Sequence, residues 1–463
     1  MAATDAAATL AALREHLAHT QTKLYTASTP GYADLERCFV VHPVRTLGIV
    51  ARPRTAADAA EVVRFCSQRG VGFSVRSGGH DCAGRTRAEG ALVVDMRDVG
   101  GVEVDGEEGT ARVGGGVLSG EVVRALGERG LATPCGSLSS VGYVGWSTLG
   151  GYGALTNRFG LGVDQIVGAR VVNAAGEVVD ADDDMLEGIR GGGGTLGVIV
   201  ELTIRVYPLR GGILHSMVVY ESGDLGAAME SYADFYEGLA EAGELPTALQ
   251  IKPLTLELPG LGMVFAVMVD WADPDEEEEG RRWISRIAGA APCVVEKTEV
   301  TSLGELLAAG DRMLTWPFHG RLSTVSIRRW TAATAAVLAR NSLTAPGGGL
   351  ALSVHTMRSA QKKNEEASSV FGARMPHHVV EIIGLVKDEA LREERIAWAG
   401  RVKEELLAED PDNVLETSYV SLGSDEDTDL KKVYGAQYGR LMALKEKYDG
   451  GNVFRHAIPR LVN

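Results

Sequence analysis

The sequence has little of what marks disulfide scaffolds, zinc proteins and membrane proteins. Among 463 residues there are only five cysteines, with no CxxC pair, so neither a disulfide framework nor a zinc site is predicted. No apolar run approaches the roughly 20 residues of a membrane span. The alanine-rich start, Met1 to His16, lacks the basic and apolar segments of a signal peptide. We therefore expect a cytoplasmic protein with reduced thiols and no membrane partner.

Positive charge is also scarce. There are 46 Lys and Arg against 62 Asp and Glu, which gives a formal net charge of −16. Such an acidic surface repels phosphate backbones, so no nucleic-acid partner is expected. The length indicates two or three domains. We expect a monomer or a homodimer.

Glycine is abundant, with 58 residues, and many of them gather in three clusters: Arg76 to His80, Val141 to Gly153 and Arg190 to Gly197. Glycine-dense loops let backbone N–H groups converge on an anion, so the clusters predict a cofactor that carries a diphosphate. The third cluster matches the spacing of the Rossmann fingerprint, but a strand and not a helix follows it. No Gly-Lys-Ser/Thr follows any cluster, which excludes a Walker loop.

The pattern of apolar residues and turns predicts an α+β fold with two domains. Up to Leu209, short strands alternate with helices, including a helix over 56–69 that ends at Gly70, a helix over 119–129 and a hairpin over 165–180. After the hinge at 210–212 the elements lengthen. The predicted strands there are 213–220, 249–256 and 263–271, and the predicted helices are 225–242, 276–288, 331–342 and 389–408. They fit an antiparallel sheet with helices on one face. The acidic run Asp275 to Glu279 is interpreted as a helix N-terminus, where carboxylates suit the dipole.

Four motifs in register resemble the vanillyl-alcohol oxidase superfamily with its PCMH-type FAD-binding domain, and within it the berberine-bridge-enzyme-like branch. They are Arg76 to His80, Val141 to Gly153, Gly191 to Ile199, and the C-terminal run from Tyr434 to Phe454. The resemblance implies an FAD-binding domain over 1–210, a substrate domain over 211–429, and a segment over 430–463 that returns to the first domain.

The resemblance also implies how FAD is held. The loop Ser77-Gly78-Gly79 would wrap the diphosphate, and an imidazole nitrogen of His80 would be bonded covalently to the flavin 8α-methyl group. A covalent bond of this kind raises the redox potential of the flavin, which eases hydride acceptance. The cofactor-binding residues implied in this way are Arg76, Ser77, Gly78, Gly79, His80, Asp81, Gly84, Leu138, Val141, Gly142, Gly145, Ser147, Thr148, Gly151, Gly153, Leu155, Gly197, Val198 and Phe454.

The chain departs from the branch at its second covalent anchor, a cysteine. Leu138 stands at that position, Trp146 replaces the motif's histidine, and Cys135 lies three residues too early. One covalent bond is therefore expected. Val141 stands where members that use O2 have a small side chain, which favours an oxidase.

The substrate side departs further. The branch's Tyr-x-Asn-Tyr motif is reduced to Tyr419-Val-Ser421-Leu422, and Phe-Pro-His-Arg becomes Phe371 to Arg374. In the run from His377 to Glu381, a strand would place His377 and Glu381 on one face and His378 on the other. HExxH spacing is absent, so no metal is expected. Glu381 would have a raised pKa in a dry pocket, or would pair with Arg374. The candidate acid–base residues are Tyr419 first, Glu381 second, then His378, Tyr143, His355 and His377.

The resemblance implies an oxidase that takes a hydride from a small alcohol, amine or secondary metabolite, with O2 as the electron acceptor. Two alternatives stay open. One is a tailoring enzyme that closes a ring or forms a double bond. The other is a flavoprotein without net redox turnover, because part of the family's polar side chains is missing.

Overall fold

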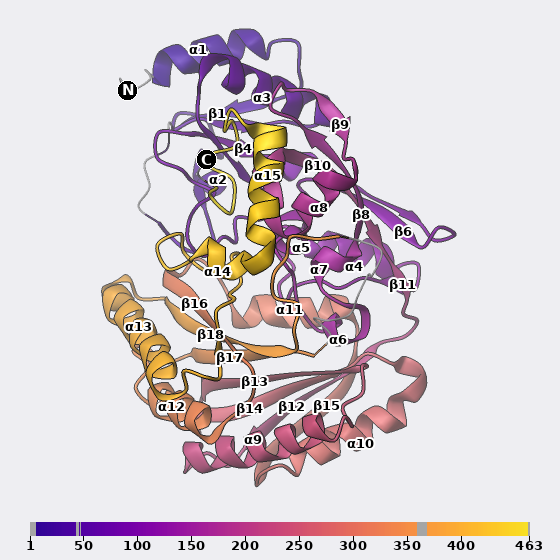
Figure 1. Cartoon of the computed structure of the whole chain (residues 1–463), viewed down its shortest axis with the longest axis vertical. Coiled ribbons are helices and arrows are strands. Elements are labelled where there is room, and N and C mark those ends of the chain that lie inside the picture. Colours follow the sequence, from indigo (N-terminus) through magenta and orange to yellow (C-terminus); the bar gives the residue numbers. More distant parts are fainter. Residues whose placement is uncertain (1–5, 43–45, 47, 359–367, 462–463) are drawn as a thin grey trace.

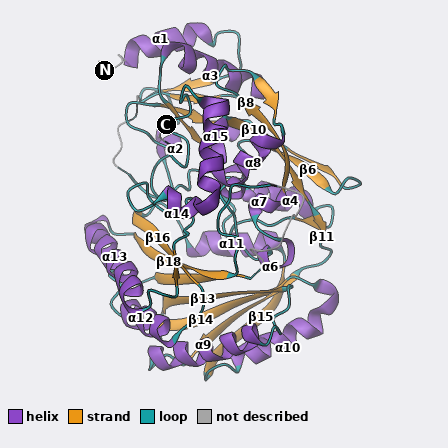
Figure 2. Ribbon diagram, viewed as in Figure 1, coloured by secondary structure: helices purple, strands orange, loops and turns teal. Residues whose placement is uncertain are grey.

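The computed structural model describes residues 6–42, 46, 48–358 and 368–461. It shows two lobes (Figure 1). The first lobe contains the N-terminal half of the chain and its C-terminal end, and the second contains a large sheet. Figure 2 shows that helices cover the face of this sheet that is turned away from the first lobe. The α+β fold predicted from the sequence is confirmed.

The first lobe begins with a four-stranded sheet in the order β1-β2-β4-β3, in which β2, β4 and β3 are parallel. The predicted helix over 56–69 is confirmed as α3, which starts after the N-cap Thr55 and ends at Gly70 with φ 66°. The alanine-rich start forms a helix over Ala6–His16 (α1), while residues 1–5 lie outside the described residues. The elements are β1 (Lys23–Tyr25), α2 (Tyr32–Glu36), β2 (Val50–Arg52), α3 (Ala56–Arg69), β3 (Phe73–Arg76) and β4 (Leu92–Asp95).

A second, antiparallel sheet of the first lobe has the order β5-β6-β10-β8-β9. The predicted hairpin is confirmed by the pairing of β8 with β9. The third glycine cluster leaves helix α8 (Asp183–Gly192) and enters strand β10, which is the order opposite to a Rossmann turn. The remaining elements are β5 (Val102–Asp105), β6 (Thr110–Gly114), α4 (Ser119–Gly127), β7 (Leu131–Ala132), α5 (Tyr143–Thr148), α6 (Thr156–Phe159), α7 (Gly162–Gln165), β8 (Ile166–Val172), β9 (Val178–Asp180), β10 (Val198–Arg205) and β11 (Tyr207–Pro208).

The second lobe is an eight-stranded antiparallel sheet in the order β15-β12-β14-β13-β17-β18-β16-β19. Its strands are β12 (Ile213–Tyr220), β13 (Leu249–Leu258), β14 (Gly262–Trp271), β15 (Cys293–Thr301), β16 (His319–Ile327), β17 (Leu350–Met357), β18 (His377–Val386) and β19 (Val414–Leu415). Its helices are α9 (Leu225–Glu241), α10 (Glu277–Ala288), α11 (Leu303–Met313), α12 (Ala332–Ser342) and α13 (Arg392–Glu409).

The predicted long elements of this lobe are confirmed within a few residues. The acidic run lies at the start of α10, as expected. Helices α9, α10, α12 and α13 form one apolar core with one face of the sheet. The opposite face is therefore free to form a wall toward the first lobe.

The C-terminal end lies against the first lobe. Helix α15 (Tyr438–Asp449), which follows α14 (Leu430–Tyr434), contacts α8. Arg440 forms ion pairs of 2.6 Å with both Asp184 and Glu187, and Leu441 and Leu444 are fully buried in the core of that lobe.

Candidate active site

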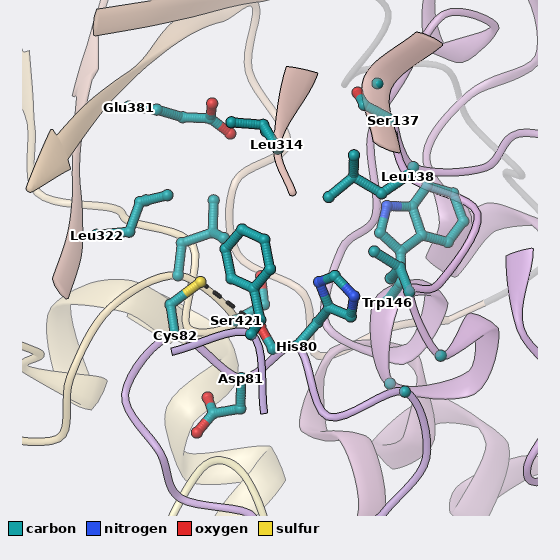
Figure 3. Close-up of a pocket in the computed structure, with 18 of the residues that line it drawn as sticks. His80, Asp81, Cys82, Ser137, Leu138, Trp146, Leu314, Leu322, Glu381 and Ser421 are labelled. Carbon is teal, nitrogen blue, oxygen red and sulfur yellow. Dashed lines mark hydrogen bonds between the residues drawn. The ribbon is translucent and has the colours of Figure 1, made fainter. Parts of the chain in front are cut away.

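A cavity of about 830 Å³ lies between the two lobes. Its first wall consists of the loops after β3 and before α5, together with residues near α8 and the C-terminus. Its second wall is the inner face of the eight-stranded sheet. In Figure 3, Glu381 and Leu314 stand on one side of the open space and His80 on the other, with Leu138 and Trp146 at its edge.

Two glycine loops of the first wall approach each other so closely that no side chain fits between them. A Cβ on Gly78 would lie 2.4 Å from the backbone nitrogen of Gly142, and a Cβ on Gly142 would lie 2.7 Å from the backbone nitrogen of Gly78. A Cβ on Gly153 would lie 2.0 Å from the carbonyl oxygen of Cys135. This packing brings the two loops into contact and leaves the backbone of these glycines open to the cavity, as a bound phosphate requires.

His80 stands at the end of the first loop, after Gly79 with φ 75°. Its ring stacks on Phe39 with centroids 4.7 Å apart, and its Nε2 lies 2.8 Å from the Ser140 hydroxyl. Burial, together with the Arg76 guanidinium, lowers the pKa of His80 to about 4. The imidazole is therefore neutral at pH 7, with a nitrogen lone pair available to a partner.

The structure brings most of the predicted cofactor residues to the cavity. Those that line it are Ser77, Gly78, Gly79, His80, Asp81, Leu138, Val141, Gly142, Gly145, Thr148, Gly151, Gly153, Gly197, Val198 and Phe454.

Four predicted cofactor residues are not among the residues that line the cavity. Arg76 lies beneath the loop, 3.7 Å from Asp95. Gly84 is packed against the His42 ring, the Ser147 hydroxyl donates to the carbonyl of Val144, and Leu155 is buried in a separate apolar cluster. These residues support the loops from behind.

On the sheet wall, Glu381 of β18 is the centre of a polar cluster. The Tyr152 hydroxyl donates to its carboxylate at 2.6 Å, and Nε2 of His355 on β17 lies 3.2 Å from the other oxygen. Burial by itself opposes ionisation. His355, Tyr152 and the charge of Lys252 outweigh it and lower the pKa of Glu381 to about 2. The carboxylate is therefore ionised at neutral pH and faces the cavity.

Comparison with known proteins identifies the family to which the chain belongs. A model described as an FAD binding domain matches residues 48–182, and one described as berberine and berberine-like matches residues 425–459. The FAD-linked oxidoreductase aurO of Gibberella zeae is 30% identical over 446 residues, which are 95% of this chain and 85% of that protein. The chain belongs to the berberine-bridge-like branch of the vanillyl-alcohol oxidase superfamily. It is an FAD-linked oxidoreductase.

Other relatives agree with this assignment. The (R)-6-hydroxynicotine oxidase of Paenarthrobacter nicotinovorans is 28% identical over 433 residues, 88% of this chain and 90% of that enzyme. Two solved structures share the fold. The 6-hydroxy-D-nicotine oxidase of Arthrobacter nicotinovorans has a TM-score of 0.80 at 24% identity, covering 96% of this chain and 98% of that one. A chitooligosaccharide oxidase has a TM-score of 0.80 at 18% identity, covering 97% and 100%.

The residues of this family member fit FAD. The glycine loops offer backbone to a diphosphate, and the neutral His80 stands in the cavity beside them. Within the described ranges, no group of three or more His, Cys, Asp or Glu residues could hold a metal ion. In the same ranges no helix is long and apolar enough to cross a bilayer.

The residue expected first as catalytic base, Tyr419, is not on the cavity wall. It is fully buried behind Tyr152, whose ring it contacts edge-on at 5.0 Å. Arg374, which was expected as a possible partner of Glu381, instead pairs with Asp164 at 2.6 Å. Tyr419 follows β19 and packs in the apolar cluster around Phe371, whose ring centroid lies 5.6 Å from its own.

Three further acid–base candidates also do not line the cavity. His378 lies on the helix-covered face, 3.7 Å from Glu237 and against the Tyr236 ring. This is the alternation that the strand predicts, since neighbouring residues point to opposite faces. Tyr143 is fully buried in the core of the first lobe. His377 likewise does not line the cavity. The expected rise in the pKa of Glu381 is wrong, because its hydrogen-bond partners outweigh burial.

Tyr152 was missed by sequence reasoning. It lies between Gly151 and Gly153, where a large side chain is conspicuous, and that position was its only signal. Gln250 and the pair His215–Asp270 were also missed. They lie on β13, β12 and β14, and only the register of the sheet brings them to the cavity.

Proposed function

We propose that the protein is an oxidase that removes two hydrogens from an alcohol or amine group of a small organic substrate. The observation that carries this proposal is the ionised Glu381, hydrogen-bonded to Tyr152 and standing across the cavity from His80. Two relatives whose names state an oxidase activity, the 6-hydroxynicotine oxidase and the chitooligosaccharide oxidase, support the reaction class.

In the proposed reaction the substrate loses a proton from oxygen or nitrogen and a hydride from the adjacent carbon, which forms a C=O or C=N bond. FAD held by the glycine loops and His80 would supply the acceptor for the hydride at N5, with O2 as the final acceptor of both electrons and, after uptake of two protons, H2O2 as the second product. Glu381 accepts the substrate proton. Tyr152 and His355 hold its carboxylate in place. A positioned acceptor of this kind contributes roughly 10²–10⁴ in rate.

His80 is the proposed point of covalent attachment, through one imidazole nitrogen to the flavin 8α-methyl group. Its low pKa supports this role, because only the neutral ring has a lone pair to form the bond. A single bond is proposed because Leu138 stands at the usual cysteine position. Cys135 is buried in the core of the first lobe and is not among the residues that line the cavity.

One experiment tests the oxidase without a known substrate. The purified protein is photoreduced under anaerobic conditions and mixed with air-saturated buffer. Flavin absorbance and peroxide are then followed. We expect rapid reoxidation with one H2O2 per flavin. Slow reoxidation in air, with rapid reoxidation by a quinone, would show a dehydrogenase instead.

Attachment is tested separately by acid precipitation. The wild-type pellet should stay yellow, and His80→Ala should release its colour to the supernatant. Wild-type protein that loses its flavin on denaturation would refute the covalent bond without affecting the oxidase proposal.

A further inference from the structure

The inner face of the large sheet changes character from one end to the other. At one end, Gln250 on β13 lies opposite Asp270 on β14, which lies opposite His215 on β12. All three line the cavity, and His215 Nδ1 is 2.7 Å from the Asp270 carboxylate. This end, with Lys252 two residues further along β13, is referred to below as the polar end.

The other end of the same face is apolar. Leu256 on β13 pairs with Leu350 on β17, and Leu322 on β16 pairs with Ile383 on β18. All four side chains line the cavity, together with Leu314 and Leu385. These six residues are the apolar end.

Glu381 stands at the border between the two ends. It pairs with Ser353 on β17 and with Thr324 on β16. Ile383 lies two residues further along β18, on the same face. A substrate whose reacting group contacts Glu381 therefore has an apolar surface on one side and polar groups on the other. Gln250 lies level with Met357 and His377, so it is separated from Glu381 by two strand spacings and by four residues along the strands, roughly 16 Å between backbones.

Gln250 has an acceptor that the protein does not use. The side chain is 4% exposed, and its Nε2 donates to the carbonyl oxygen of Thr356 at 3.2 Å, which fixes the orientation of the amide because a carbonyl can only accept. Its Oε1 is buried without a hydrogen-bond partner in the described part of the chain. A buried acceptor left unpaired is costly, so a ligand that donates to it gains binding energy.

Lys252 restricts the chemistry of that ligand. Its ammonium group can only donate, and its four-carbon chain spans the roughly 7 Å between neighbouring residues on one face of a strand. A carboxylate would satisfy Lys252 but cannot donate to Gln250. An ammonium group would donate to Gln250 but be repelled by Lys252. A hydroxyl group does both.

We propose that the substrate is an amphiphilic molecule with a hydroxyl-bearing arm at Gln250 and Lys252, an apolar arm over the leucines, and its oxidised carbon between them. This inference rests on the proposed function, because it takes Glu381 as the position of the reacting group. It excludes oligosaccharides, which have no apolar arm to place against Leu256, Leu322 and Leu350.

Ketones test the inference, because they have the shape of a product and cannot deliver a hydride. The probes are 1-(4-hydroxyphenyl)hexan-1-one, its analogue without the phenolic hydroxyl, its 4-carboxyl analogue, and 4′-hydroxyacetophenone. Binding to the oxidised protein is measured by the perturbation of flavin absorbance. The hydroxylated hexanone should bind about tenfold more tightly than the deoxy and carboxyl analogues. Its affinity should also exceed that of the acetophenone by at least about tenfold, since each buried CH₂ increases affinity roughly fourfold.

Variants assign each preference to its end of the sheet. Gln250→Met should reduce the hydroxyl preference to below about threefold without weakening the deoxy ketone, because only the acceptor for the hydroxyl is removed. Lys252→Met, at a less buried position, should also reduce the hydroxyl preference. It replaces Gln250→Met as the test if that variant does not fold. Leu322→Ala should reduce the chain-length preference and leave the hydroxyl preference intact.

Equal weakening of both ketones by the Gln250 and Lys252 variants would show a structural role and overturn the subsite. If the carboxyl analogue bound more tightly than the hydroxylated hexanone, the proposed hydroxyl group of the substrate would be wrong. If none of the four probes bound, the proposed substrate class would be wrong. None of these results depends on turnover or on O2, so they are distinguishable from failure of the proposed function.

Discussion

The wall of the cavity supplied by the first lobe is rich in glycine, whereas few glycines lie on the wall supplied by the sheet. The first wall is tight, since a Cβ at Gly78, Gly142 or Gly153 would collide with backbone atoms. The second wall has a hydrogen-bond acceptor, Oε1 of Gln250, that has no partner among the described residues. The cofactor wall therefore depends on glycines that let its loops touch. The substrate wall depends on the chemistry of its side chains.

The strongest test of this contrast is Gly142→Ala. Its Cβ would lie 2.7 Å from the backbone nitrogen of Gly78, and backbone cannot move aside cheaply. We expect nearly complete loss of FAD, measured as flavin absorbance per protein. Gly127→Ala, in α4 and not on the cavity wall, is the matched control, since a Cβ there meets nothing within 4 Å. Full FAD content in Gly142→Ala would show that the contact between the loops is not what holds the cofactor site open.

Side-chain chemistry on the second wall is tested by Glu381→Gln. With the alcohol that reduces the flavin fastest, the anaerobic reduction rate should fall roughly 10²–10⁴-fold, because the amide cannot accept the substrate proton. FAD content should stay unchanged. Tyr419→Phe is the control and should react nearly as wild type, because Tyr419 lies behind Tyr152. A large loss in Tyr419→Phe with little in Glu381→Gln would return the role of base to Tyr419.

The contrast also explains what the sequence could predict. His80 and the glycine loops are local: contiguous residues form each loop, and glycine is required where φ is positive or backbones touch, as at Gly79 and Gly142. Most of the cofactor wall was therefore predicted. Arg76, Gly84, Ser147 and Leu155 were predicted too, although they do not line the cavity, because a motif does not show which of its residues face inward.

The substrate wall could not be predicted in the same way. Gln250, Asp270 and His215 belong to three strands, and they meet only because the pairing of β13, β14 and β12 sets them in one row. Alternation along β18 correctly separated Glu381 from His378. It could not show that Tyr152, from the other lobe, would reach Glu381, or that Tyr419 would lie behind Tyr152.

A smaller effect is expected at Val141, which lines the cavity on the FAD side. Val141→Leu adds one methylene beside the His80 loop and should slow reoxidation of the reduced protein by O2 several-fold. Flavin reduction by substrate should hardly change, because the substitution fills space without altering a polar group. Stopped-flow measurement of both half-reactions tests this. Equal reoxidation rates in the two proteins would place the path of O2 elsewhere.

The smallest effect at neutral pH, but a diagnostic one, is expected for His355→Asn. In the folded protein the pKa of Glu381 is about 2, below the usual 4.5, so its carboxylate is ionised throughout the range from about pH 4 upward. His355 is the largest of the influences that lower it, while burial raises it. Without His355 the pKa of Glu381 must rise. Flavin reduction should then be close to wild type at high pH and should fall with decreasing pH in a range where the wild type is flat. His377→Asn, on the same strand but not lining the cavity, controls for general damage. Overlapping profiles for His355→Asn and wild type would mean that His355 does not set the charge of Glu381, and that the sheet wall, like the FAD wall, acts mainly by shape.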